Sequence, residues 1–305
     1  MLRVAFVTTA DAEAVHDDLD RPFADAAFAR ADIDLVHAPW EDDAVDWDVF
    51  DLVVVRSPWN YVENETAFRS FLDRRRSSVR FENPVPVIEW NIDKRYLLDL
   101  ASHGVPVVPT TYVEQYEDIA AALAAVEVPE LVVKPTVSAG SRLTGRFTFG
   151  DQRAAALCDA ILSDGRAAMV QPYLPAVDDE GEYAVIVIDG VIAHRAIKGQ
   201  ILEVGGTFLG GEYREIISAA EPDDVLDEVA RRAADACRDL ARARGWLGST
   251  DELLYARYDV ARTEDGEAVL LEAELFEPAL FLPSGPAAAD RLADAVVRRI
   301  DRARS

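Results

Sequence analysis

Three short hydrophobic segments near the start of the chain carry the first structural signal. Arg3 to Thr8 and Ile33 to His37 have strand-like composition, and Leu52 to Val55 is entirely apolar. A helical stretch around Pro22 to Ala31 separates the first two segments. The strand–helix–strand order predicts a parallel sheet, and ligands bind such sheets near the carboxyl ends of the strands. We therefore expect the N-terminal part of the chain to be an α/β unit.

The third apolar segment runs into a polar and aromatic sequence, RSPWNY, at the expected ligand edge of the sheet. It offers Arg56, Ser57, Trp59 and Tyr61 as candidate substrate-binding residues. An arginine beside hydrogen-bonding and aromatic groups suits a small anionic molecule. The same residues also suit a packed turn in which Trp59 fills a gap. Both interpretations stay open at the level of sequence.

A second pattern, LVVKPTVSAGSRLTGRFT, covers Leu131 to Thr148. It predicts a strand that Pro135 ends, a turn-rich loop with Ser138 and Gly140, and a second strand. Small residues let backbone N–H groups approach an anion, and Lys134 adds a positive charge. The loop therefore indicates a phosphate-covering hairpin. An ordinary surface hairpin is the alternative, because neither strict phosphate-loop nor dinucleotide-binding glycine pattern is present.

Two strong turn signals predict antiparallel hairpins later in the chain. Asp189-Gly190 joins strands at Tyr183 to Ile188 and Val191 to Lys198, and Asp265-Gly266 joins strands at Leu253 to Arg262 and Ala268 to Phe276. Counting pairs outward from the first turn predicts one shared face, made of Tyr183, Val185, Val187, Ile192, His194 and Lys198.

The second hairpin concentrates acidic residues on one face. Counting from its turn, Glu264 faces Glu267, Asp259 faces Glu272 and Arg257 faces Glu274, while residues between them, including Leu271, face the core. Adjacent carboxylates repel one another, and one arginine does not cancel three charges. A hard divalent cation such as Mg²⁺ does. The alternative is a solvated acidic face in an acid-rich protein, although the strand LLEAEL is unusually apolar for one.

Acidic residues outnumber basic ones, and arginine greatly outnumbers lysine. The 305-residue chain has 56 acidic and 31 basic residues and a formal net charge of −25, which argues against nucleic-acid and anionic-membrane partners. Only three basic residues are lysines, namely Lys94, Lys134 and Lys198. Because other surface positions use arginine, we expect these lysines where a compact ammonium group is required. Adaptation to high salt and the arginine bias of a GC-rich genome both fit this composition.

Nothing in the sequence indicates an oxidising compartment or a membrane. Cys158 and Cys237 lie far apart in alanine-rich stretches and are expected to be buried, reduced thiols. No signal peptide and no apolar run of the ~18 residues that span a bilayer are recognisable. We expect a cytoplasmic protein. The sequence leaves the oligomeric state open, a homodimer included.

Together these motifs resemble the ATP-grasp superfamily, in its glutathione-synthetase-like branch, over nearly the whole chain. The resemblance implies an α/β and α+β architecture. Its parts are a pre-ATP-grasp domain at 1–90, an N-lobe at 91–170 and a C-lobe with the metal site at 171–305. It also implies ATP and Mg²⁺ (or Mn²⁺) as cofactors, and the following ATP-binding residues: Lys94, Lys134, Ser138, Gly140, Gln171, Tyr173, Leu174 and Glu182.

The resemblance also assigns the metal ligands and the chemistry. Asp259, Glu272 and Glu274 match the metal ligands, although the family's usual last ligand is asparagine. RSPWNY, NIDKRYLL, KPTVSAG and LLEAELFEPALF are similar to the subfamily of cyclo-ligases that close O-ureido-serine to cycloserine. The implied reaction activates a substrate carboxylate as an acyl phosphate for attack by a nitrogen nucleophile, with Arg257, Arg214 and Lys198 as candidate catalytic residues.

Three other functions remain open at this stage. They are a two-substrate amino-acid or peptide ligase, a phosphotransferase that stops after phosphoryl transfer, and an ATP-binding sensor or interaction protein without turnover. With each of these functions the expected binding partner is a small molecule.

Overall fold

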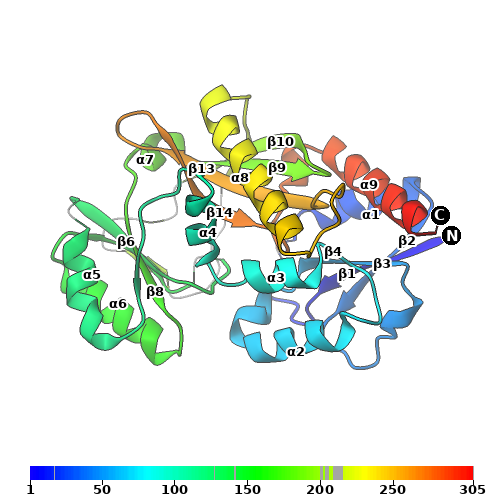
Figure 1. Cartoon of the computed structure of the whole chain (residues 1–305), viewed down its shortest axis with the longest axis horizontal. Coiled ribbons are helices and arrows are strands. Elements are labelled where there is room, and N and C mark those ends of the chain that lie inside the picture. The colour runs from blue at the N-terminus through cyan, green and yellow to red at the C-terminus, as the bar shows by residue number, and fades with distance from the viewer. Residues whose placement is uncertain are drawn as a thin grey trace.

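The computed structural model describes residues 1–16, 18–126, 128–140, 142–199, 202, 206–208 and 216–304. These residues form three sheets (Figure 1). No helix among the described residues is both long and apolar enough to cross a membrane.

The first sheet is parallel and has the strand order β2-β1-β3-β4. Alternating side chains of its strands face opposite sides: Val4 and Phe6 pack toward helices α1 and α9, and Ala5 and Val7 pack toward α2. The predicted N-terminal α/β unit is therefore confirmed. Its elements are β1 (Leu2–Thr8), α1 (Arg21–Arg30), β2 (Ile33–Pro39), β3 (Leu52–Ser57), α2 (Glu65–Arg75) and β4 (Phe81–Glu82).

Two short helices lead out of this sheet, namely α3 (Val85–Asn91) and α4 (Tyr96–Ser102). Pro84 precedes α3, and Pro86 lies in its first turn. Proline is tolerated there because the first helical N–H groups have no intrahelical partner. Val87 and Leu97, from these two helices, belong to the same hydrophobic core as α8.

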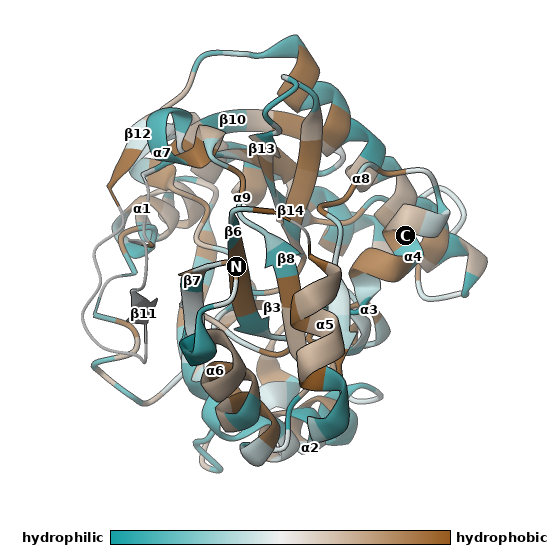
Figure 2. Cartoon of the chain, turned by 90° about the vertical axis from the view of Figure 1, so that its left-hand side faces the viewer, coloured by the Kyte–Doolittle hydropathy of each residue, from teal (hydrophilic) through white to brown (hydrophobic). Residues whose placement is uncertain are grey.

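The second sheet is antiparallel, with the strand order β11-β7-β6-β8-β5. Helices α5 and α6 pack together over it, and hydrophobic residues run along β6 (Figure 2). Its elements are β5 (Thr111–Val113), α5 (Ile119–Ala125), β6 (Glu130–Pro135), β7 (Thr144–Thr148), α6 (Gln152–Ser163), β8 (Ala168–Pro172) and β11 (Thr207–Phe208).

The third sheet is also antiparallel, with the strand order β12-β10-β9-β13-β14. Val185 on one face packs with α8, and Ile186 on the other packs with α9, which runs beside α1 (Figure 1). Its elements are α7 (Ala176–Glu180), β9 (Glu182–Ile188), β10 (Val191–Lys198), β12 (Ile217–Ala219), α8 (Asp224–Ala243), β13 (Tyr255–Arg262), β14 (Ala268–Glu274) and α9 (Ala287–Arg304).

The β9–β10 hairpin differs from its predicted register by one residue. Its two-residue turn is as expected, with positive φ at Asp189 and Gly190. A register shift between Ile192 and His194 then inserts Ala193, so that Lys198 pairs with Glu182. The predicted common face of Tyr183, His194 and Lys198 is therefore wrong, because a bulge moves every later side chain to the other face.

The β13–β14 hairpin departs from prediction twice, and the two differences cancel. The Thr263 N–H donates to the Glu267 carbonyl, so the loop holds three residues and Glu264 does not face Glu267. A bulge at Leu271 then restores the count, so that Asp259 pairs with Glu272 and Arg257 with Glu274. Leu271 lines the central cavity instead of facing the core as predicted.

Candidate active site

A cavity of about 770 Å³ lies between the second and third sheets and extends to the N-terminal sheet. Residues of β6 and β8 form one wall, and residues of β10, β13 and β14 form the opposite wall. The polar side chains among its described lining residues are Asp20, Trp59, Lys94, Lys134, Ser138, Thr144, Gln171, Tyr173, Glu182, Lys198, Arg257, Glu272, Glu274, Glu277 and Ser284.

All three lysines of the chain reach this cavity, and two of them are held by carboxylates. Lys94 Nζ donates to the Ser138 carbonyl at 2.9 Å and to Ser138 Oγ at 3.0 Å, and lies 3.2 Å from Glu272 Oε1. Lys198 Nζ lies 2.9 Å from Glu182 Oε2 and 3.0 Å from Asp259 Oδ2. The bulge in β10 creates the contact with Glu182, since it brings these two residues opposite each other.

Lys134 is different, because none of the described residues forms an ion pair or hydrogen bond with its ammonium group. Burial lowers the pKa of Lys134, and Lys94 lowers it further, against the raising effect of Glu272. A buried cation without a partner is costly, and an anionic ligand relieves that cost. The second sheet thus presents a lysine ready for an anion such as a phosphate group.

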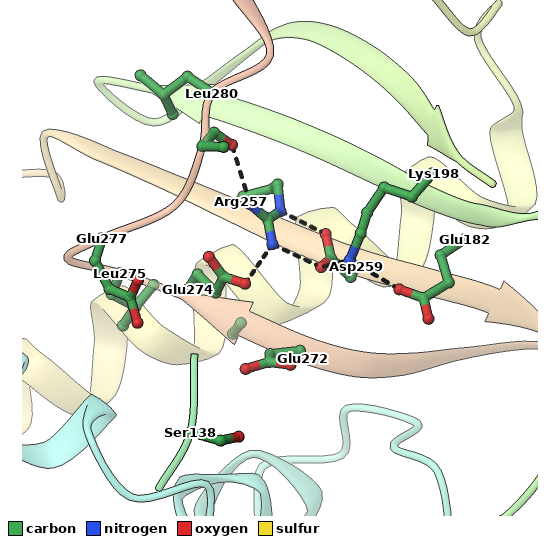
Figure 3. Close-up of polar contacts among 12 residues, drawn as sticks. Ser138, Glu182, Lys198, Arg257, Asp259, Glu272, Glu274, Leu275, Glu277 and Leu280 are labelled. Atoms are coloured by element: carbon green, nitrogen blue, oxygen red, sulfur yellow. Dashed lines mark hydrogen bonds and ion pairs between the residues drawn. The ribbon is translucent and has the colours of Figure 1, made fainter. Parts of the chain in front are cut away.

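Arg257 organises the acidic face of the opposite wall (Figure 3). Its Nε donates to Asp259 Oδ1 at 2.8 Å, its Nη2 donates to Asp259 Oδ2 at 3.0 Å and to Glu274, and its Nη1 donates to the Ala279 carbonyl at 3.0 Å. Asp259 is only 1% exposed and lies behind the cavity wall, whereas Glu272 and Glu274 line the cavity.

These partners give the three carboxyl groups different acidities. Burial opposes ionisation of Asp259, but Arg257 and Lys198 outweigh it and hold its pKa well below the usual value. Burial is likewise outweighed at Glu272, where Lys94 and Lys134 lower the pKa. Burial prevails at Glu274 and, with the neighbouring carboxylates, raises its pKa to about 7 in spite of Arg257.

The donor set fits a hard divalent cation only in part. The described residues contain no group of three acidic, histidine or cysteine side chains arranged around one metal position. Both carboxylate oxygens of Asp259 already accept hydrogen bonds, from Arg257 and from Lys198. Glu272 and Glu274 are two residues apart on β14, both line the cavity, and carboxylate oxygens are what Mg²⁺ prefers. The structure therefore supports these two carboxylates as cation ligands more than Asp259.

Residues 171–174, which include three of the expected ATP-binding residues, line the cavity. The Gln171 side chain donates to Thr110 Oγ1 at 2.8 Å, and the Tyr173 N–H donates to the Glu130 carbonyl at 2.9 Å. The Leu174 N–H has no acceptor among the described residues, which leaves it available to a ligand. Arg146 lies over the Tyr173 ring, 3.5 Å from its centroid, and holds this corner in place.

Of the four residues predicted at the end of β3, only Trp59 reaches the cavity wall. Arg56 is 5% exposed and pairs with Asp20, 3.2 Å away, and Ser57 donates to Thr8 Oγ1 at 3.2 Å. Neither Arg56 nor Ser57 is thus among the described residues that line the cavity. Tyr61 is 1% exposed and reaches the cavity only through its bond to Glu277.

Sequence reasoning missed two acidic residues of the cavity, Asp20 and Glu277. Asp20 accepts the N–H groups of Leu280 at 2.5 Å and Leu282 at 2.8 Å and so holds the segment after β14. Glu277 stands in the sequence ELFEPALF, where an acid between apolar residues was the available signal.

Some predicted residues lie outside the described part of the chain. These are Arg214 and Ser141, the latter in the loop after Lys134. Gly140, at the edge of that loop, lines the cavity with φ +58°, a conformation that glycine adopts without strain.

Comparison with known proteins finds relatives over the whole chain. Residues 4–83 match the family described as the N-terminal domain of D-cycloserine synthetase DcsG. Over 97% of its length the chain is 36% identical to the cycloserine biosynthesis protein DcsG of Streptomyces lavendulae, of which 98% is covered. The crystal structure of D-cycloserine synthetase DcsG matches with a TM-score of 0.89 at 34% identity, over 98% of this chain and 99% of that chain.

A more distant match concerns the fold alone. The ATP-grasp ligase PsnB, in a structure complexed with a phosphomimetic variant of its minimal precursor, Mg and ADP, matches with a TM-score of 0.58 at 15% identity. The match covers 98% of each chain. Three consecutive sheets around one cavity are thus the ATP-grasp architecture.

Proposed function

This chain belongs to the D-cycloserine synthetase DcsG family of ATP-grasp ligases, and from that premise we propose that it is a cyclo-ligase acting on O-ureido-serine or a related ureido-amino acid. The ATP-grasp resemblance that the sequence motifs indicate is confirmed, and so is the class of reaction, an ATP-dependent ligase. The substrate and the roles of individual residues below are our proposal.

One observation carries the substrate assignment, namely the extent of the match to DcsG. The 36% identity runs across 97% of this chain and 98% of the relative, so it includes the acceptor end of the cavity as well as the nucleotide end. A likeness confined to the ATP-binding lobes would support a ligase of any substrate.

We assign the end of the cavity near β6 and β8 to ATP. Lys134 and Lys94 are placed to contact its phosphates, with Ser138 and Gly140 covering them, and the free Leu174 N–H suits a base edge. The lack of a carboxylate partner for Lys134 supports this assignment, because a phosphate supplies the missing charge.

We assign Glu272 and Glu274 as the residues that hold Mg²⁺, with Mn²⁺ as a substitute. Asp259 joins them only if Arg257 or Lys198 releases one of its oxygens. When bound, the ion supplies positive charge that offsets the charge developing on a transferred phosphoryl group. Glu182 and Asp259 meanwhile hold the Lys198 ammonium group at the cavity wall.

The proposed chemistry needs a substrate carboxylate held next to the ATP phosphates. A carboxylate oxygen attacks the γ-phosphorus and ADP leaves; a nitrogen of the same molecule then bonds to the carbonyl carbon, loses its proton, and inorganic phosphate leaves. Arg257 lines the cavity between Glu274 and the segment after β14, where its guanidinium can orient the carboxylate and stabilise the tetrahedral centre. Arg214 remains a candidate for the same task.

The division into domains at 1–90, 91–170 and 171–305 is also proposed. The three sheets support it with two exceptions, both in the second sheet: β8 crosses the boundary at 170, and β11 lies within 171–305 but pairs with β7. Helices α3 and α4 straddle the first boundary, since both contribute to the core beneath α8.

The test is ADP release by the wild-type protein with Mg·ATP, in buffers with and without molar KCl. Its substrates are O-ureido-serine, other ureido-amino acids, and amino-acid pairs, and products are identified by mass spectrometry. We expect ADP release with O-ureido-serine alone and a cyclised product. Release that needs a second amine would replace the cyclo-ligase with a two-substrate ligase. A stable phosphorylated product would indicate a phosphotransferase.

A further inference from the structure

Glu277 is a buried acidic residue at the acceptor end of the cavity, in the segment that follows β14. It lines the cavity and is 8% exposed. Two aromatic residues of the N-terminal unit fix its position. The Tyr61 hydroxyl donates to Glu277 Oε1 at 2.9 Å, and Trp59 Nε1 donates to the Glu277 carbonyl at 3.0 Å. These two hydrogen bonds therefore fix the position of Glu277 in the cavity wall.

This carboxyl group has no cation of its own. Among the described residues, no lysine, arginine or histidine lies within ion-pair distance of Glu277, and the only side-chain donor to it is the neutral Tyr61 hydroxyl. Buried carboxylates are normally paired. Burial raises the pKa of Glu277 to about 8, and the neighbouring Glu274 contributes to that rise. No described residue therefore supplies a positive charge to pair with Glu277, and the ammonium group of a ligand can supply one.

The surroundings of Glu277 match the two charged ends of an amino acid. Arg257 donates to the Ala279 carbonyl, two residues beyond Glu277, and its guanidinium lies over the Phe281 ring, 5.0 Å from the centroid. An arginine suited to a carboxylate and an acid suited to an ammonium group therefore flank one end of the cavity, as the labelled side chains in Figure 3 show.

We propose that Glu277, positioned by Tyr61, binds the ammonium group of the amino-acid substrate and so selects amino acids over uncharged analogues. This inference rests on the proposed function, because it assumes a substrate with a carboxylate and an amino group. It makes Glu277 a specificity residue that contacts substrate, and it involves no covalent step.

The test compares O-ureido-serine with its des-amino analogue, in which hydrogen replaces the amino group. Binding is measured by calorimetry with Mg²⁺ and a non-hydrolysable ATP analogue, so the result does not depend on turnover. We expect the wild type to bind O-ureido-serine ~100-fold more tightly than the analogue, because the analogue leaves a buried acid unpaired. Glu277→Gln should bind the two ligands within ~3-fold of each other, with unchanged affinity for the nucleotide.

Two further variants separate recognition from general damage. Tyr61→Phe keeps the carboxyl group but removes its positioning donor, and should lose only part of the preference. Glu89→Gln makes the same substitution at a residue that pairs with Arg76 away from the cavity, and should keep the full preference. In turnover, Glu277→Gln should raise KM for O-ureido-serine while KM for ATP stays constant.

The inference is overturned if Glu277→Gln retains the wild-type preference, or if the wild type itself fails to distinguish the two ligands. The comparison of the two ligands with the wild type remains decisive even if the variant does not fold. Failure of the proposed function looks different: the wild type would bind O-ureido-serine in preference to the analogue yet release no ADP and form no cyclic product.

Discussion

Two kinds of buried carboxyl group meet at the cavity, and they differ in what compensates their charge. Asp259, Glu272 and Glu274 come from the β13–β14 hairpin and have arginine or lysine partners. Glu277 comes from the segment after the hairpin and has only a phenol donor among the described residues. Lysine and arginine partners compensate the first set, although the pKa of Glu274 is still raised to about 7, whereas no cation of the described residues pairs with Glu277.

The difference would let one cavity hold both the proposed metal ion and the proposed ammonium group of the substrate. Pairing with cations keeps Asp259 and Glu272 ionised, as their lowered pKa values indicate. An ionised acid is suited to bind a metal ion or to orient a lysine permanently. Glu277, whose pKa is raised to about 8, exchanges a proton near neutrality until a cationic ligand arrives. The four predictions below test this contrast.

Asp259→Asn should have the largest effect. It leaves Arg257 and Lys198 as buried cations that have lost their shared partner, which costs roughly 3–5 kcal/mol of stability. It should also reduce ADP release by more than ~1,000-fold, because it removes the carboxylate that holds both cations, leaving Arg257 with Glu274 and Lys198 with Glu182. Urea denaturation and an ADP-release assay measure the two effects.

Asp227→Asn is the matched control for that change. Asp227 is 1% exposed and pairs with Arg195 at 2.6 Å, but it lies outside the cavity. We expect a comparable loss of stability with turnover largely retained. Similar loss of turnover in both variants would mean that Asp259 acts only through stability.

Glu272→Gln should reduce ADP release by ~100- to 1,000-fold while the fold stays intact. Lys94 keeps its two bonds to Ser138 in this variant, so no buried cation is left without a partner. We expect this loss because Glu272 is a proposed ligand of the cation. The Mg²⁺ concentration that gives half-maximal activity should therefore rise. Near-normal turnover with an unchanged Mg²⁺ requirement would remove Glu272 from that site.

The two hairpins show which parts of the site sequence predicts. The facing pairs Asp259–Glu272 and Arg257–Glu274 are correct as predicted. The turn itself was placed one residue off, and the bulge at Leu271 compensated for it. In β9–β10 the turn was right, but the bulge at Ala193 had no compensating error, so the predicted face of Lys198 was wrong. Bulges inside apolar runs leave no clear mark in the sequence, and each one exchanges the two faces.

Contacts between residues far apart in the chain could not be predicted from the sequence either. Arg56 looks like a ligand contact in sequence, yet Asp20, 36 residues away, neutralises it in the fold. Tyr61 and Glu277 are 216 residues apart and meet only because the N-terminal sheet packs against the segment after β14. Residue types and local spacing predicted the lysines and the acidic hairpin. Partners brought together by packing could not be predicted in that way.

Lys134→Met should have a moderate and selective effect. The methionine keeps the apolar stem but removes the ammonium group, so the dissociation constant of ATP should rise by ~10- to 100-fold in a titration. Stability should stay equal or increase slightly, because the variant no longer buries a cation without a partner. Unchanged nucleotide affinity would show that this lysine does not contact ATP.

The last prediction concerns pH and distinguishes Glu277 from Asp259 and Glu272, whose pKa values are lowered. A folded-state pKa of about 8 lies above the value of about 4.3 in an unfolded chain, so the folded protein holds a proton that the unfolded chain releases between these values. Wild-type stability should therefore fall relative to Glu277→Gln as pH rises through this window, by about 1.4 kcal/mol per pH unit at most, and level off above pH ~8. Urea denaturation of both proteins at pH 5 to 9, with EDTA present, measures the difference. Equal pH dependence of the two proteins would mean that Glu277 is already paired, like the carboxylates of the hairpin.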